Sequence, residues 1–387
     1  MNILYIVRND LWQIFGGDTI QIEKTKEYTE KLYDANITII YENNFTLEAL
    51  DYNYDIYHFW GIGVSSQIGE IIEKLKNKNK HTIISSIYWD LTDSIFIKYF
   101  TQKILNYKIF PIYEILVKVF ISYIFKPMAY LSPKYRKKMM YVWGTKIFKY
   151  ERELAIKNAD MIIPNSSEEG IVLCKTIGLS YDAVKNKFLS VPNSVDIAFI
   201  NKSKPTVFMS DVKDFVIEAA GIEPLKNQLS IVRALYDNPE IPIIFAGAIR
   251  NEEYYHKIKR LADKRGNVYF TGKIAPKDLF SLYKRAKVHV LASFRESPGL
   301  ATLEALMCGS QIVVSNEKYC PIKYYKFDKY GFVCNPYDVK SIRNAILEAY
   351  NHPKDISLPD EYIKFFSYEN VANMTYNVYE RVLSEKQ

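Results

Sequence analysis

Two carboxylates flank the stretch of this 387-residue chain that is best suited to bind an anion. Seven residues separate Glu296 from Glu304. Ser297 is a good N-cap and Pro298 suits a first helical position, whereas Gly309 suits the end of a helix. We therefore expect a helix to begin between the two carboxylates and to end at Gly309.

The start of such a helix carries backbone N–H groups that have no intrahelical partner. Those of Gly299 and Leu300 can donate to a phosphate, and the helix dipole adds about 0.3–1 kcal/mol. Gly299 has no Cβ, so a ligand can approach its backbone closely. A ligand with a central pyrophosphate can then place one sugar on each carboxylate. The alternative is that Glu296 complements the helix dipole and that Glu304 is an exposed helix residue.

Apolar runs at Val288–Ser293 and Gln311–Ser315 predict strands on either side of this helix. The alternation of strand and helix continues through the second half of the chain, with strands expected near 215–219, 241–246, 267–271, 288–293, 311–315 and 331–334. It predicts a doubly wound parallel sheet, in which ligands bind at the carboxyl ends of strands. The first half shows similar apolar runs, with strands expected at Asn2–Val7, Ile37–Tyr41, Asp55–Phe59 and His81–Ile87.

The string from Glu296 through Pro298-Gly299-Leu300 to Glu304-Ala305 and Gly309 resembles the donor-sugar signature of one enzyme family. That family is the retaining GT-B glycosyltransferases of the family 4 type, or glycosyl transferases group 1. The resemblance implies that Glu296 contacts the transferred sugar and that Glu304 holds the ribose hydroxyls. It also implies that the backbone between them, including Ser297, holds the diphosphate.

The segment Ile222–Gln228 resembles the second donor motif of this family, in which a lysine reaches the diphosphate. Lys226 occupies that position. The resemblance therefore implies that Lys226 is the phosphate cation, and the alternative is an ordinary surface lysine.

The family usually has an arginine directly before Ile222, whereas this chain has Gly221. Loss of a bidentate phosphate donor removes charge-assisted hydrogen bonds of about 1.5–3 kcal/mol each. Either Arg295, Lys273 or Arg250 substitutes for the missing arginine, or donor binding is weakened.

Two glycine-containing segments complete the expected donor site. Gly16 and Gly17 follow the first strand and resemble the loop that covers the donor phosphates in the family, although glycines also form ordinary turns. Gly272 and Lys273 end a segment, Val268–Lys273, that resembles the one facing the nucleotide base.

The acceptor side departs from the family pattern. Many members carry a histidine at the end of the strand His81–Ile87, where this chain has Tyr88-Trp89-Asp90. The aromatic pair can stack on a sugar or serve the core, and Asp90 can accept a proton from a hydroxyl group. His58 is either an acid–base group or a core histidine.

Residues 95–150 concentrate the positive charge of the chain. They hold eleven Lys and Arg residues and one acidic residue, so this region carries +10 and the remainder −3. Ile112–Phe125 is nearly all apolar but shorter than the roughly 20 residues that span a bilayer. The combination predicts either contact with an anionic membrane surface or a buried helix with a solvated basic face. No recognised nucleic-acid-binding fold accompanies the charge.

Composition is that of a globular protein, with 48% hydrophobic and 25% charged residues. The four cysteines form no CxxC pair, which favours reduced thiols over a zinc or disulfide role. The start of the chain, MNILYIV, is expected to be a strand rather than a signal peptide. We therefore expect a cytoplasmic protein that binds peripherally to the inner face of the membrane.

These observations predict a GT-B fold, with two Rossmann-like doubly wound α/β domains facing a cleft. Residues 1–196 are expected to bind the acceptor, 197–213 to form a linker and 214–366 to bind the nucleotide sugar. The last segment, 367–387, is expected to be a helix that crosses back to the first domain, capped by Ser367.

The predicted activity is transfer of a hexose from a UDP- or GDP-linked donor to a glycan or lipid-linked acceptor, in surface polysaccharide or glycolipid assembly. Lys226, Glu296 and Asp90 are the expected catalytic residues. No cofactor or metal ion is expected, since protein dipoles and cations can neutralise the diphosphate and the chain has no Asp-x-Asp triplet. Alternatives are an inactive GT-B subunit acting as a binding partner or chaperone, and an epimerase or phosphorylase of the same fold. A dehydrogenase is disfavoured because no GxGxxG follows a predicted strand.

Overall fold

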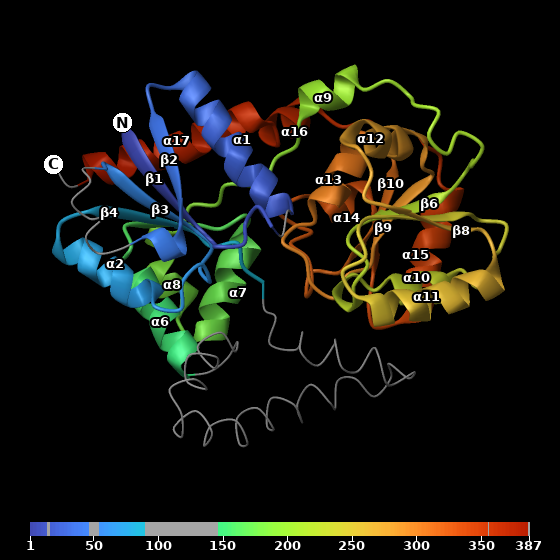
Figure 1. The fold of residues 1–387 in the computed structure, drawn as a ribbon, viewed down its shortest axis with the longest axis horizontal. Helices are drawn as coiled ribbons and strands as arrows, with labels where there is room; N and C mark the ends of the chain where they lie inside the picture. Colours follow the sequence, from blue (N-terminus) through green and yellow to red (C-terminus); the bar gives the residue numbers. More distant parts are fainter. Residues whose placement is uncertain (14–15, 46–53, 90–145, 355, 386–387) are drawn as a thin grey trace. The chain divides into compact units, whose positions relative to one another are not determined.

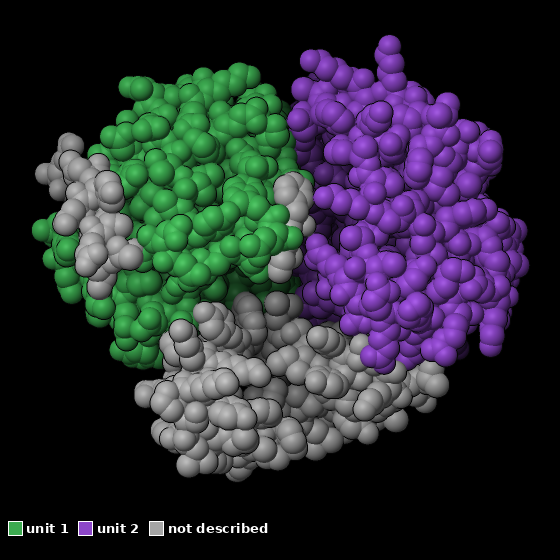
Figure 2. Space-filling view, in the orientation of Figure 1, with its two compact units in different colours: residues 1–92, 118–194, 364–387 green, residues 93–117, 195–363 purple. Residues whose placement is uncertain are grey.

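A computed structural model describes residues 1–13, 16–45, 54–89, 146–354 and 356–385. They form two compact units, each with one parallel sheet and helices packed against it (Figure 1). One unit holds the described residues up to 194 together with those from 364 onward, and the other holds 195–363 (Figure 2). The prediction of two parallel α/β units is confirmed.

The amino-terminal unit has a parallel sheet of strand order β2-β1-β3-β4-β5. Its strands are β1 (Asn2–Val7), β2 (Asn36–Tyr41), β3 (Ile56–Trp60), β4 (His81–Ser85) and β5 (Met161–Ile163). Its helices are α1 (Gly17–Leu32), α2 (Ile68–Asn77), α6 (Lys146–Asn158), α7 (Ser167–Ile177), α8 (Tyr181–Val184) and α17 (Tyr368–Ser384), with short 3-10 helices η1 (Glu42–Asn44) and η4 (Lys185–Lys187). The strands are continuous apolar runs because helices cover both faces of the sheet.

The carboxyl-terminal unit has a parallel sheet of strand order β11-β10-β9-β6-β7-β8. Its strands are β6 (Val216–Ala219), β7 (Ile243–Ala246), β8 (Val268–Gly272), β9 (Val288–Leu291), β10 (Gln311–Ser315) and β11 (Phe332–Cys334). All six lie where the alternation of the sequence predicts them. The chain runs outward from β6 to β8, then returns to start β9 on the other side of β6. The pair β6 and β9 is therefore the topological switch point, where α/β sheets bind ligands.

The helices of this unit form two layers around its sheet (Figure 1). They are α9 (Ile197–Lys202), α10 (Gln228–Ala234), α11 (Glu252–Arg265), α12 (Pro276–Arg285), α13 (Leu300–Met307), α14 (Phe327–Tyr330) and α15 (Val339–Asn351), with the 3-10 helix η5 (Pro224–Lys226). Residues of α10, α11 and α15 share one buried apolar cluster with β6, β7 and β9. A further helix, α16 (Asp360–Phe365), spans the point where the chain returns to the first unit.

The final helix packs within the amino-terminal unit. Ser367 caps α17 by accepting a hydrogen bond from the Asn370 N–H at 3.2 Å, as the sequence predicts. The Tyr379 hydroxyl lies 2.9 Å from the Tyr5 hydroxyl and 2.8 Å from His58 Nδ1. These buried hydrogen bonds join the helix to strands β1 and β3.

The segment expected as a linker is not wholly irregular. Residues 197–202 form α9, whose N-cap Asp196 accepts from the Phe199 N–H at 2.8 Å. Lys284 Nζ on α12 donates to the carbonyls of Ile200 and Ser203, each at 2.6 Å. The segment is therefore attached to the carboxyl-terminal unit. No helix in the described part of the chain has the length and apolar character needed to cross a membrane.

Candidate active site

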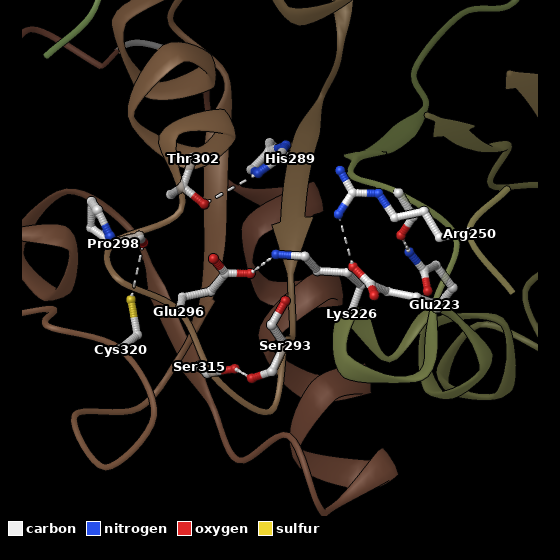
Figure 3. Close-up of polar contacts among 12 residues, drawn as sticks. Glu223, Lys226, Arg250, His289, Ser293, Glu296, Pro298, Thr302, Ser315 and Cys320 are labelled. Atoms are coloured by element: carbon white, nitrogen blue, oxygen red, sulfur yellow. Dashed lines mark hydrogen bonds and ion pairs between the residues drawn. The ribbon is translucent and has the colours of Figure 1, made fainter. Parts of the chain in front are cut away.

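The switch point of the carboxyl-terminal sheet brings together the two residues that the sequence singles out most strongly. Lys226 follows β6 and Glu296 follows β9, and Lys226 Nζ lies 2.5 Å from Glu296 Oε1 (Figure 3). The Glu296 side chain is 9% exposed and that of Lys226 is 20% exposed. An opposite-charge pair of this kind, mostly removed from water, fixes both side chains.

Hydrogen bonds from the Asn227 side chain and from the backbone hold the Lys226 loop against the Glu296 loop. Asn227, which has φ of +63°, donates through Nδ2 to the carbonyls of Ala292 at 3.0 Å and Pro336 at 2.8 Å. The Phe294 N–H donates to the Leu225 carbonyl at 3.0 Å. These hydrogen bonds connect the two loops beyond the ends of β6 and β9.

The backbone around Glu296 is fixed from two other directions. Its N–H donates to the Tyr319 carbonyl at 2.8 Å. A Cβ at Gly299 would lie 2.7 Å from Leu291 Cδ2 and 3.3 Å from Glu296 Oε2. We expected glycine at position 299 because a ligand could then approach the backbone closely. The structure instead shows that the side chains of Leu291 and Glu296 occupy the space where a Cβ would lie.

The helix starts later than the sequence predicts. Its N-cap is Gly299, in the left-handed region at φ +86°, and α13 begins at Leu300. Ser297 and Pro298, which are joined by a cis peptide bond, precede the helix, so the predictions of Ser297 as N-cap and Pro298 as first helical residue were wrong. Gly309, at φ +80°, follows the helix end as predicted.

A third carboxyl group, which the sequence analysis missed, lies in β6 and is affected by the charges of the ion pair. Glu218 is buried, and neither of its carboxylate oxygens has a hydrogen-bond partner among the described residues. Burial raises its pKa well above the ordinary value, with Lys226 opposing and Glu296 reinforcing that shift. One feature of the sequence could have indicated this group: Glu218 is the only charged residue in an otherwise apolar strand, and Lys226 lies in the loop that follows that strand.

The pKa of Lys226 moves in the opposite sense to that expected from burial alone. Desolvation lowers the pKa of a lysine, but the attraction and hydrogen bond of Glu296 outweigh it and raise the pKa of Lys226. Lys226 is thus held as an ammonium ion, the form that binds a diphosphate.

Glu304 lies in the second turn of α13, partly buried beside the hydroxyl of Tyr283 on α12. Burial raises the pKa of Glu304 to about 7, while Tyr283 opposes the rise. The carboxyl group therefore changes its charge near neutral pH. His289 and Thr302 are hydrogen-bonded at 3.3 Å at the start of the same helix (Figure 3).

The three candidates for the missing arginine lie in different surroundings. The Arg295 guanidinium is buried over the ring of Tyr319, 4.8 Å from its centroid, and the side chain is 7% exposed. Lys273 is exposed directly after Gly272, which ends β8 at φ +66°. Arg250 follows β7 and contacts Gly221 itself.

The remaining predicted residues belong to the amino-terminal unit. Gly16 is the N-cap of α1 and Gly17 its first residue. Tyr88 and Trp89 are buried after β4, whereas Asp90 lies outside the described residues, as does most of the basic region 95–150.

His58 is wholly buried, with Nδ1 bonded to Tyr379 and Nε2 2.9 Å from the Ser85 hydroxyl. Burial lowers its pKa to about 3, so it is neutral and fits the core interpretation. Among the side chains that the structure describes, no cluster of three or more His, Cys, Asp or Glu residues is arranged to hold a metal ion.

Comparison with known proteins assigns the carboxyl-terminal unit. Residues 201–364 match the family described as glycosyl transferases group 1. This part of the chain is therefore similar to glycosyl transferases group 1. The matched residues include Lys226, Glu296 and Glu304, so the match supports the resemblance predicted from the sequence.

The chain is also similar to the serotype-specific mannosyltransferase WbdA of Escherichia coli, with 30% identity over 189 residues. That match covers 45% of this chain but only 22% of WbdA.

Two solved structures share the fold across both units. One is sucrose-phosphate synthase from Thermosynechococcus elongatus, with a TM-score of 0.68, 13% identity and 100% coverage of both chains. The other is Anabaena HepE in complex with UDP, with a TM-score of 0.62, 14% identity and coverage of 100% and 98%. The chain therefore has the GT-B fold.

Proposed function

We propose that this protein is a nucleotide-sugar-dependent hexosyltransferase that acts on a glycan or lipid-linked acceptor with retention of configuration. The observation that carries the proposal is the Lys226–Glu296 pair at the switch point of a unit similar to glycosyl transferases group 1. The pair places the Lys226 ammonium group, which can bind a diphosphate, next to the Glu296 carboxylate, which can bind a sugar. The similarity to WbdA, a mannosyltransferase, supports the transfer of a hexose.

The proposed reaction breaks the bond between the anomeric carbon and the diphosphate oxygen of the donor. Lys226 and the N–H groups of Gly299 and Leu300 stabilise the negative charge that develops on the leaving diphosphate. Glu296 orients the sugar, whose anomeric carbon becomes oxocarbenium-like, and Glu304 accepts hydrogen bonds from the ribose hydroxyls. Interactions that strengthen as the bond breaks accelerate the reaction.

The acceptor hydroxyl is proposed to attack from the face that the diphosphate leaves. Its oxygen forms the new bond to the anomeric carbon, and its proton passes to the departing phosphate oxygen. Asp90 is proposed to bind the acceptor hydroxyl, and Gly16-Gly17 to cover the donor phosphates. The basic region 95–150 is proposed to hold the enzyme peripherally at the inner, anionic face of a membrane, where a lipid-linked acceptor is within reach.

The test is calorimetric titration of the full chain with UDP-glucose, UDP-galactose, UDP-N-acetylglucosamine and GDP-mannose. We expect micromolar binding of one donor, slow hydrolysis of that donor, and at least tenfold weaker binding by Glu304→Ala. Glu348→Ala, an exposed glutamate on α15, is the matched control and should bind as wild type does. Absence of binding by any donor to folded protein would reject the proposal.

A further inference from the structure

Backbone hydrogen bonds and close packing connect the loop after β6, which contains Lys226, to the loop after β7. The N–H groups of Arg250 and Asn251 both donate to the Ile222 carbonyl at 3.1 Å. A Cβ at Gly247 would lie 2.0 Å from the Ala220 carbonyl oxygen, so the two backbones are in direct contact. Hydrogen bonds and packing therefore fix the backbone position of Arg250.

Gly221 forms the surface on which the Arg250 side chain lies. A Cβ built at Gly221 would lie 2.7 Å from both Cδ and Nε of Arg250. The arginine thus occupies the space into which any side chain at position 221 would project. A side chain at position 221 would therefore compete with Arg250 for this space.

The guanidinium of Arg250 reaches the same loop as Lys226. Its Nη1 lies 3.4 Å from Oε1 of Glu223, and Glu223 is in turn one of the carboxylates whose charge acts on Lys226 (Figure 3). The Arg250 side chain is 42% exposed, so a ligand can contact it. Each of the two cations is tethered to a different carboxylate, Lys226 to Glu296 and Arg250 to Glu223.

The other two candidate cations are less suitably placed. The Arg295 guanidinium is stacked on Tyr319 and buried, and Lys273 follows β8, which is separated from β6 by β7. Arg250 follows β7, the direct neighbour of β6.

We propose that Arg250, lying on Gly221, is the second phosphate-binding cation of the donor site and acts together with Lys226 on the diphosphate. This inference rests on the proposed function. The planar guanidinium can bind one phosphate through two parallel hydrogen bonds, whereas Lys226 acts as a point charge on the other. The ion pair with Glu223 positions the guanidinium. Because its N–O distance is 3.4 Å and both side chains are partly exposed, the pair is weak enough for a phosphate to replace Glu223.

The first experiment compares nucleoside diphosphates with monophosphates, using the full chain and titration calorimetry with UDP, GDP, UMP and GMP. We expect Arg250→Ala to weaken binding of the diphosphate by tenfold or more and that of the monophosphate by less than threefold. Arg250→Lys should fall between wild type and alanine. Arg260→Ala, an exposed arginine on α11, is the matched control and should bind as wild type does.

The second experiment relocates the arginine. Gly221→Ala should displace Arg250 and weaken diphosphate binding in the same direction as Arg250→Ala. The double variant Gly221→Arg with Arg250→Gly returns one guanidinium to the shared volume and should recover most of the lost affinity. Circular dichroism and thermal melting establish whether each variant is folded. If Arg250→Ala does not fold, Arg250→Lys is compared with wild type instead.

The outcomes separate this inference from the proposed function. If wild type binds a nucleotide sugar and Arg250→Ala binds UDP or GDP equally well, Arg250 has no phosphate role and only this inference is overturned. If wild type binds no nucleotide, the donor site itself is rejected and the inference falls with it.

Discussion

Lys226 Nζ and Glu296 Oε1 lie 2.5 Å apart although the two residues are 70 positions apart in the chain. The opposite charges of the pair compensate each other and keep both side chains at the carboxyl ends of β6 and β9. A diphosphate that approaches Lys226 must share the ammonium with Glu296, so the position of the phosphate becomes linked to that of the carboxylate.

This coupling can be measured by a double-mutant cycle. Lys226→Ala leaves the Glu296 carboxylate largely buried without its cation, which should lower the free energy of unfolding by about 1–3 kcal/mol. Lys226→Ala combined with Glu296→Gln should lose less than the sum of the single variants, with an interaction of about 0.5–3 kcal/mol. Urea denaturation at pH 7.5 gives these values, and strictly additive losses would show that the pair contributes nothing to folding.

Nucleotide-sugar binding should depend on pH through Glu304. Burial raises the pKa of Glu304 to about 7. Ribose hydroxyls donate stronger hydrogen bonds to an ionised carboxylate than to a protonated carboxyl group. Binding therefore favours the carboxylate and releases a proton below pH 7. We expect affinity to fall by up to about tenfold from pH 8 to pH 6 and to level off above pH 8.

Titration of a nucleotide sugar in two buffers of different ionisation enthalpy measures that proton release. Glu304→Gln should bind more weakly than wild type at pH 8 and show no release between pH 6 and 8. An unchanged pH dependence in this variant would assign the effect to another group.

Glu218 should make the protein more stable in mild acid than at neutral pH. Its pKa is raised in the folded state, so the unfolded chain loses this proton first as pH rises. The contribution is favourable below the ordinary carboxyl pKa and is lost as pH rises toward the folded-state pKa. Glu218→Gln keeps the shape without the charge and should raise the melting temperature at pH 8 by about 2–4 °C.

Differential scanning fluorimetry from pH 5 to pH 8 tests this prediction. The gap between variant and wild type should shrink toward pH 5, and exposed Glu348→Gln should show no gap. A lower melting temperature for Glu218→Gln at pH 8 would mean that Glu218 is ionised and paired in the folded protein.

Alanine at Gly299 should disturb both stability and donor binding. The new methyl group would collide with Leu291 and crowd Glu296, and φ of +86° is itself unfavourable for alanine. We expect the free energy of unfolding to fall by about 2–4 kcal/mol, combining the backbone cost with overpacking.

Gly309→Ala is the matched control for this variant. Gly309 has φ of +80°, yet a Cβ there meets no atom within 4 Å, so only the backbone cost of about 1–2 kcal/mol remains. Equal losses in the two variants would show that contact with Leu291 and Glu296 is unimportant.

The sequence predicted the six strands of the carboxyl-terminal sheet because parallel strands covered on both faces are continuous apolar runs. It misplaced the start of α13 because the N-cap depends on the left-handed backbone of Gly299, and the Ser297-Pro298 pattern resembles an ordinary helix start.

The sequence could not choose among Arg250, Arg295 and Lys273 because that choice depends on which loops are neighbours. The contact between Gly221 and Arg250 crosses from the β6 loop to the β7 loop and leaves no trace in local pattern. Glu218 was missed for a related reason, since its pKa depends on burial and on the charges of Lys226 and Glu296, which the local sequence does not show.

The position of α17 has a consequence for the order in which the chain folds during synthesis. The amino-terminal sheet shares buried hydrogen bonds with Tyr379, so its fold is completed by residues that a ribosome makes after the whole carboxyl-terminal unit. The carboxyl-terminal unit, which is continuous among the described residues, can fold first, while the amino-terminal strands remain incomplete. Newly made chains that stop before α17 would therefore expose the apolar surface of β1 and become substrates for chaperones.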